Sequence, residues 1–63
     1  MNKEETVQLM LQSFEDDNMT FCLQAGMEES EAKDKISESR PTMKYFFSNI
    51  YDILLEKNII KSE

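Results

Sequence analysis

Apolar residues recur along this chain at the three- and four-residue steps of an α-helix, most densely between residues 41 and 60. In that stretch one wide helical face is formed by Met43, Phe46, Phe47, Ile50, Ile53 and Leu54. Tyr51 and Leu55 extend apolar surface around the side of the same helix. The rest of the chain has few apolar residues to cover it. The pattern therefore predicts a C-terminal helix, over about residues 41–58, with more apolar surface than the chain covers by itself.

A second apolar stripe predicts a first helix over about residues 3–25. Its members are Val7, Met10, Leu11 and Phe14, followed in the same phase by Phe21, Cys22 and Ala25. Asn2 is expected to cap this helix while Glu5 reaches back in a capping box. Gly26 is expected to end it, because glycine enters the left-handed conformation without steric cost.

The acidic segment at residues 15–18 leaves the continuity of the first helix open. Its carboxylates repel one another, and Asp and Asn favour caps over helix interiors, so we expect a kink or short break there. One long helix is the alternative, because the apolar stripe continues in the same phase beyond this segment.

A short middle helix is predicted over about residues 28–38, with a thin apolar stripe of Ala32 and Ile36. Pro41 suits the first turn of the next helix, and it disfavours a helical conformation at Arg40. We therefore expect a single all-α domain over residues 1–63, a small bundle of three helices, or of four if the first helix breaks. The expected core is Val7, Leu11, Phe14, Phe21, Ala25, Ile36, Met43, Phe46, Phe47, Ile50, Ile53 and Leu54.

The length of the chain makes self-association the expected source of additional stability. A chain of 63 residues buries only about 60% of its unfolded surface, so it is marginally stable without further support. Cys22 is the single cysteine and histidine is absent, so neither an internal disulfide nor a zinc site is expected, and no cofactor is predicted. We expect a homo-oligomer, with a dimer formed through the C-terminal helix as the first hypothesis.

Acidic residues outnumber basic ones by thirteen to seven, which gives the chain a formal charge of −6. All of this excess lies in residues 1–40, which have ten acidic and four basic residues, whereas residues 41–63 have three of each. Direct binding to nucleic acid needs clustered Lys and Arg, so a basic protein surface is the more natural partner. The sequence lacks a signal-peptide pattern and a membrane-spanning apolar run, and with its lone cysteine it is expected to be cytoplasmic.

Residue types that carry out catalysis are scarce in this chain, and we do not expect an enzyme. Without histidine to activate it, Cys22 is expected to act as a small buried apolar residue among Phe21, Leu23 and Ala25. The acidic segment at residues 15–18 lacks the glycine and the closing glutamate of an EF-hand, so no metal site is predicted.

Two groups of side chains are the predicted contacts with a protein partner. Three acidic residues share one side of the middle helix. On the C-terminal helix, Tyr51 and Leu55 lie beside the main apolar stripe, and Tyr45 lies on the polar side. Tyrosine is enriched at binding hot spots. The leading hypothesis is a non-enzymatic regulatory protein that binds and modulates a larger protein with a basic or apolar surface. The predicted contact residues are Tyr51, Leu55, Tyr45, Glu31, Asp34 and Glu38.

Two alternatives remain open. In one, Ser39, Arg40, Thr42 and Lys44 bind an anionic ligand such as a nucleotide in an oligomer, at the start of the C-terminal helix. The simpler interpretation, which we favour, is that Arg40 pairs with acidic residues of the preceding helix. In the other alternative, the acidic residues imitate a nucleic-acid backbone and occupy a basic binding site. In brevity, acidity and helical content the chain resembles small regulatory proteins, including phage proteins that inhibit or take over host proteins.

Overall fold

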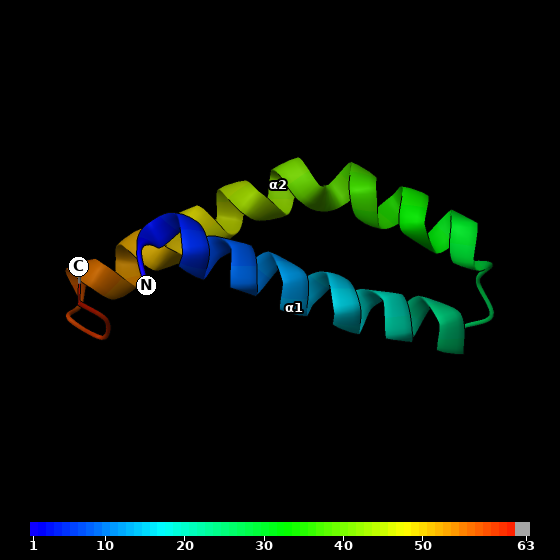
Figure 1. Ribbon diagram of the computed structural model, residues 1–63, viewed down its shortest axis with the longest axis horizontal. Helices are drawn as coiled ribbons and strands as arrows, with labels where there is room; N and C mark the ends of the chain where they lie inside the picture. Colours follow the sequence, from blue (N-terminus) through cyan, green and yellow to red (C-terminus); the bar gives the residue numbers. More distant parts are fainter. Residues whose placement is uncertain (62–63) are drawn as a thin grey trace.

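The chain folds into two antiparallel α-helices joined by a short turn, α1 (Lys3–Gln24) and α2 (Glu29–Glu56) (Figure 1). The computed structural model describes residues 1–61. The predicted all-α fold is confirmed. The prediction of three or four helices is wrong, because the helices expected over residues 28–38 and 41–58 form the single helix α2. The hairpin is elongated, since its radius of gyration is 13.9 Å, against about 10.6 Å for a compact chain of this length.

The N-terminus of α1 has the predicted capping box. The Oδ1 atom of Asn2 accepts a hydrogen bond from the backbone amide of Glu5 at 2.8 Å. The carboxylate of Glu5 in turn accepts a hydrogen bond from the backbone amide of Asn2 at 3.5 Å. These two bonds satisfy amide groups that have no partner within the helix, so they fix where α1 begins.

No break interrupts α1 at residues 15–18, so that part of the prediction is wrong. The side chains of Asp16 and Asp17 are exposed, and water and salt screen the repulsion between their carboxylates. Asn18 lies on the apolar side of α1, where its Oδ1 atom accepts a hydrogen bond from Sγ of Cys22 at 3.6 Å. Packing and this local bond outweigh the weak preference of Asp and Asn for helix ends.

Gly26 ends α1 as the sequence predicts. Its φ angle is 93°, a left-handed conformation that a residue with a Cβ atom adopts only with strain. The amide of Gly26 donates to the carbonyl of Leu23, and the amide of Met27 donates to the carbonyl of Cys22. This pair of bonds is a Schellman motif, which satisfies the last carbonyls of α1 and turns the chain toward α2.

Pro41 lies inside α2, and the predicted helix boundary at this residue is wrong. Proline has no amide hydrogen to donate to the carbonyl of Ser37, and it disfavours the helical conformation at Arg40. The helix continues because Ile36 before the proline and Met43 after it both pack toward α1. The ribbon of α2 changes direction near its middle (Figure 1), as expected for a helix that accommodates a proline.

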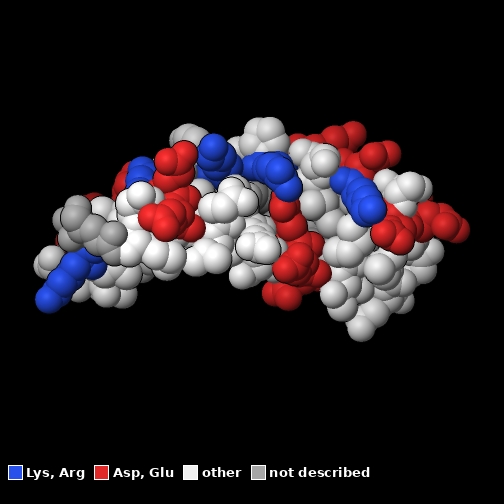
Figure 2. Space-filling model, viewed as in Figure 1, with Lys and Arg blue, Asp and Glu red and all other residues white. Residues whose placement is uncertain are grey.

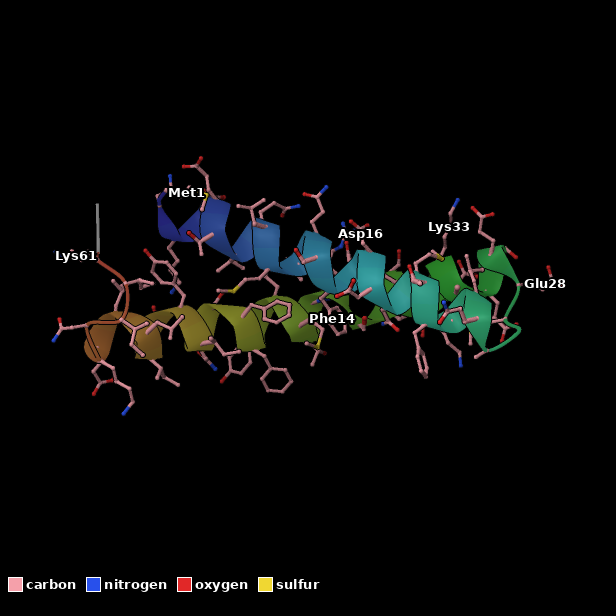
Figure 3. The ribbon with its side chains drawn as sticks, turned by 90° about the horizontal axis from the view of Figure 1, so that it is seen from below. Met1, Phe14, Asp16, Glu28, Lys33 and Lys61 are labelled. Carbon is pink, nitrogen blue, oxygen red and sulfur yellow. The ribbon has the colours of Figure 1, made fainter. Side chains whose placement is uncertain are left out.

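The core is a narrow line of contact between the two helices. Phe14 of α1 points toward α2 (Figure 3), where its ring meets the ring of Phe47 edge-on at a centroid distance of 5.8 Å. Ile60 lies beyond α2 and packs back against the core. The buried side chains among residues 1–61 are those of Val7, Leu11, Cys22, Ala32, Ile36 and Tyr51. Burial of Cys22 agrees with the sequence prediction.

Part of the predicted core is on the surface. With only two helices, each helix has one neighbour and buries a single narrow stripe, whereas the prediction assumed neighbours on two sides. Half-buried positions include Phe14, Met43, Phe47 and Leu54. The predicted core residues that are exposed instead are Phe21, Ala25, Phe46, Ile50 and Ile53.

Candidate protein-binding surfaces

The outer ridge of α2 consists of Glu31, Asp34, Glu38 and Tyr45, all of which are exposed. Steps of three, four and seven residues place them along one line of the helix, on the side away from α1. At 1.5 Å per residue the ridge is about 21 Å long. The sequence pattern predicted these residues on two separate helices. The continuity of α2 brings the three carboxylates and the tyrosine into register on one surface.

A second surface of α2 is apolar and also faces solvent. Phe46, Ile50 and Ile53 follow one another at steps of four and three residues, and between 43% and 50% of each residue is exposed. The ring of Phe46 meets the ring of Tyr45 edge-on at a centroid distance of 5.9 Å. This aromatic contact joins the apolar surface to the outer ridge.

The opposite side of the hairpin is the charged face, which we define by Glu15 and Asp16 of α1 and Lys33 and Arg40 of α2. Asp16 and Lys33 point to the same side of the hairpin (Figure 3), and Arg40 follows Lys33 by two turns. A broad face on which acidic and basic side chains alternate is visible in Figure 2.

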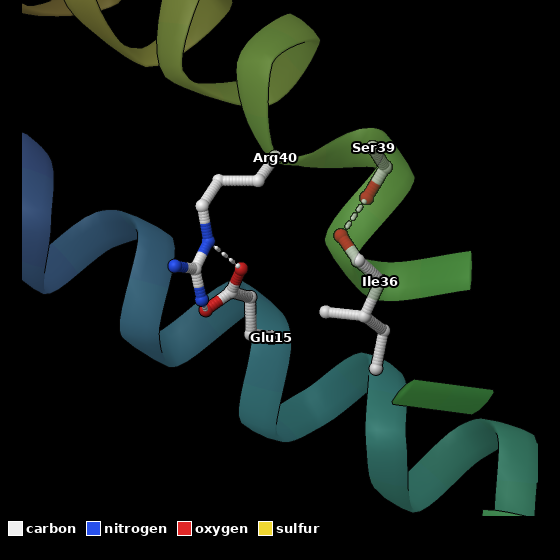
Figure 4. Close-up of polar contacts among 4 residues, drawn as sticks. All are labelled: Glu15, Ile36, Ser39 and Arg40. Carbon is white, nitrogen blue, oxygen red and sulfur yellow. Dashed lines mark hydrogen bonds and ion pairs between the residues drawn. The ribbon is translucent and has the colours of Figure 1, made fainter. Parts of the chain in front are cut away.

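The ion pair between Arg40 and Glu15 joins the two helices on the charged face (Figure 4). The Nε and Nη2 atoms of Arg40 each donate a hydrogen bond of 2.8 Å to the carboxylate of Glu15. These hydrogen bonds, and then the charge of Glu15, raise the pKa of Arg40. Arg40 therefore pairs with an acidic residue of α1. The favoured interpretation of the sequence, that it pairs with acidic residues of the preceding segment, is wrong.

The apolar face, which we define as Phe21 of α1 with Phe46, Ile50 and Ile53 of α2, lies opposite this ion pair. Six residues turn an α-helix by about 600°, so Phe21 lies about 120° from Glu15, beyond the line that contacts α2. Phe46 likewise follows Arg40 by six residues on the antiparallel helix, so it too lies about 120° from the residue of the ion pair. Both aromatic residues therefore lie on the broad face that the ion pair does not occupy. Phe21 is 70% exposed, the largest exposed fraction among the apolar residues of this face.

The prediction that Tyr51 is an exposed contact residue is wrong. Only 4% of Tyr51 is exposed, because it packs in the core with Val7 and Leu11. Leu55 is half-buried against the same cluster. The side of α2 that faces α1 is therefore not the predicted one. Tyr51 and Leu55 face α1, whereas Phe46, Ile50 and Ile53 of the main stripe face solvent. The sequence identified the excess of apolar surface but not the side on which it is exposed.

The residues predicted to bind an anion do not form a helix N-terminus. Because α2 continues through this region, the amides expected to be free after Pro41 lie inside a helix. Ser39 donates its hydroxyl hydrogen to the carbonyl of Ile36 at 2.9 Å (Figure 4). Thr42 and Lys44 are exposed, and Lys44 lines a shallow groove with residues of α1. The two features on which the anion site depended, free amides and an unpaired arginine, are therefore not found at these positions.

Within residues 1–61 no group of three or more His, Cys, Asp or Glu side chains is arranged to hold a metal ion. Neither α1 nor α2 combines the length and the hydropathy that crossing a bilayer requires. Comparisons with protein families, curated proteins and solved structures found no match.

Proposed function

We propose that this chain is a small acidic protein that acts without catalysis, by associating with a second copy and binding a larger protein. One observation carries the proposal, namely the exposure of Tyr45, Phe46, Ile50 and Ile53 over two turns of α2. Contiguous apolar surface of this kind marks interaction sites on soluble proteins, because its burial against a partner is favourable.

The outer ridge supports a partner with a basic surface. Its three carboxylates attract Lys and Arg side chains, and the net charge of −6 speeds the encounter with a positively charged protein. Tyr45 adds a side chain that has both apolar area and a hydroxyl, a combination that is frequent at hot spots. The larger protein is therefore expected to contact the outer ridge through basic residues that surround an apolar pocket for Tyr45.

The test is a quantitative capture experiment with matched variants. The wild-type protein, Tyr45→Ala and the control Leu9→Ala are immobilised and exposed to extract of the native cell, and captured proteins are quantified by mass spectrometry. Leu9 is an exposed apolar residue of α1, so its truncation removes apolar area away from the ridge. We expect a protein that the wild type and the control retain equally and that Tyr45→Ala retains at least about fivefold less.

Circular dichroism of each variant shows whether the hairpin is preserved, which is expected because both side chains are exposed. If Tyr45→Ala and an added Glu38→Lys change leave the captured proteins and their amounts unchanged, the outer ridge does not bind a partner and the proposal is rejected.

A further inference from the structure

The hairpin exposes more surface than a compact chain of its mass. Its solvent-accessible area is 4927 Å², whereas a compact monomer of 7.4 kDa is expected to expose about 4200 Å². The excess is therefore about 700 Å². A stable interface of standard size takes about 800 Å² from each partner. The area that the hairpin leaves uncovered is thus close to what one copy loses when it joins a dimer.

The apolar face is the part of this uncovered surface that a second chain of the same negative charge can contact. From residue 42 to 53, the line of α2 that includes Phe46, Ile50 and Ile53 also includes Thr42 and Asn49, and Lys57 follows just after the helix. None of these positions is acidic. The carboxylates of the outer ridge and of the charged face lie on other sides of the hairpin. Two chains with a charge of −6 each can therefore bring the α2 part of the apolar face together without placing its carboxylates against each other, and Asp17 of α1, one turn before Phe21, is the acidic residue beside this face.

We propose that a second copy docks on the apolar face, so that two hairpins form a four-helix bundle with twofold symmetry. This inference rests on the self-association in the proposed function and names its surface. A twofold interface uses the same patch on both copies, and the apolar face can serve as that patch because exposed apolar side chains of both helices contribute to it. In the bundle each helix has two neighbours, and Phe21, Phe46, Ile50 and Ile53 become interior positions. The outer ridge stays exposed for the larger protein.

Sedimentation equilibrium from micromolar to millimolar concentration tests the proposal. We expect the wild type to approach twice the chain mass of 7.4 kDa, and Ile50→Glu to stay at 7.4 kDa over the same range. A buried glutamate at the twofold interface would lose hydration without a partner, so the dimer is disfavoured. The control is Leu9→Glu, which adds the same charge at an exposed apolar residue outside the apolar face and should leave the dimer intact.

A milder variant decides the result if Ile50→Glu also loses its helical circular dichroism. Phe46→Ala removes an aromatic ring that is half exposed in the hairpin, and it should raise the dissociation constant of the dimer at least about tenfold. The proposal is overturned if the wild type remains a monomer, or if its mass converges on more than two chains. It is equally overturned if Phe46→Ala dissociates like the wild type, or if Leu9→Glu is the variant that abolishes the dimer.

A wild type that stays monomeric would reject self-association itself, and with it the dimer interface, whereas failure of the interface alone and failure of partner binding appear in different measurements. Failure of the dimer interface appears in the mass of the Ile50 and Phe46 variants, with no partner present. Failure of partner binding appears as unchanged capture by the Tyr45 and Glu38 variants. Both side chains of the latter pair lie on the outer ridge, which the dimer leaves in solvent.

Discussion

Replacing Pro41 with alanine distinguishes one continuous α2 from two helices that meet at the proline. In a helix interior, proline is about 3 kcal/mol less favourable than alanine, since it lacks the amide hydrogen and its ring crowds the preceding turn. Proline also restricts the unfolded chain, which offsets about 1 kcal/mol of that difference. Pro41 is exposed, so its removal costs little packing. The substitution should therefore stabilise the folded protein by about 2 kcal/mol.

The sign of this change is the informative part of the result. If a helix began at Pro41, the proline would occupy the first turn, where its fixed φ angle is already helical and its missing amide hydrogen is not needed. Alanine would then leave stability unchanged or lower it. The structure places Pro41 twelve residues after the start of α2 at Glu29, where the missing bond to the carbonyl of Ser37 is a real loss.

Urea unfolding followed by circular dichroism measures the free energy of unfolding for both proteins. All samples are kept at one protein concentration, because self-association would otherwise change the apparent stability. The expected gain corresponds to a rise of about 8–16 °C in the midpoint of thermal unfolding. The control is Thr42→Ala, an exposed neighbour with an amide hydrogen, which should gain no more than about 0.7 kcal/mol. A Pro41→Ala protein that is no more stable than this control would refute the continuous helix.

Three further substitutions test individual contacts. Asn2→Ala removes the side-chain cap of α1 and should lower the free energy of unfolding by about 1 kcal/mol in urea titrations, whereas Asn2→Asp should not. Tyr51→Ala should lower the free energy of unfolding by about 3–5 kcal/mol, enough to unfold much of the protein. Tyr51→Phe should change this free energy by no more than about 0.5 kcal/mol, because no hydrogen bond joins the Tyr51 hydroxyl to residues 1–61. Arg40→Gln should lower the thermal midpoint at low salt, and the deficit should shrink in molar salt, since the Arg40 side chain of the pair is exposed to solvent. The raised pKa of Arg40 means that its guanidinium stays charged until strong alkali, where its contribution to the ion pair is lost. Equal deficits at low and high salt would contradict the ion-pair account.

The ends of α1 could be predicted from the sequence because their signals are local. Asn2 and Glu5 are three residues apart, and the capping box needs no other part of the chain. Gly26 likewise ends the helix through bonds within five residues. The continuity of α2 could not be predicted in this way. The preference of Pro41 for a first turn is overridden by packing against α1, a contact between residues far apart in the sequence.

A rotation of α2 by one residue position decides which of its apolar residues face α1. Tyr51 and Leu55 are buried or half-buried, while Ile50 is exposed, and adjacent residues differ by 100° around a helix. Apolar residues occur on both sides of this boundary, so periodicity fits either arrangement. The buried side is decided by how the two helices cross. The N-terminal half of α1, with Val7 and Leu11, packs against the side of α2 that includes Tyr51. The three acidic residues of the outer ridge were easier to identify, since charged residues that share a face avoid the core wherever the crossing falls.

Salt should have opposite effects on the two interactions that we propose. Two chains with a charge of −6 each repel one another, so added sodium chloride should screen that repulsion and lower the dissociation constant of the dimer. Binding of the outer ridge to a basic partner depends on attraction, so the same salt should slow association and weaken capture. Sedimentation and capture, each measured at low and at high salt, compare the two trends in one protein. If both interactions weaken together as salt increases, the dimer is held by charge rather than by the apolar face, and the division of the hairpin into two binding surfaces is incorrect.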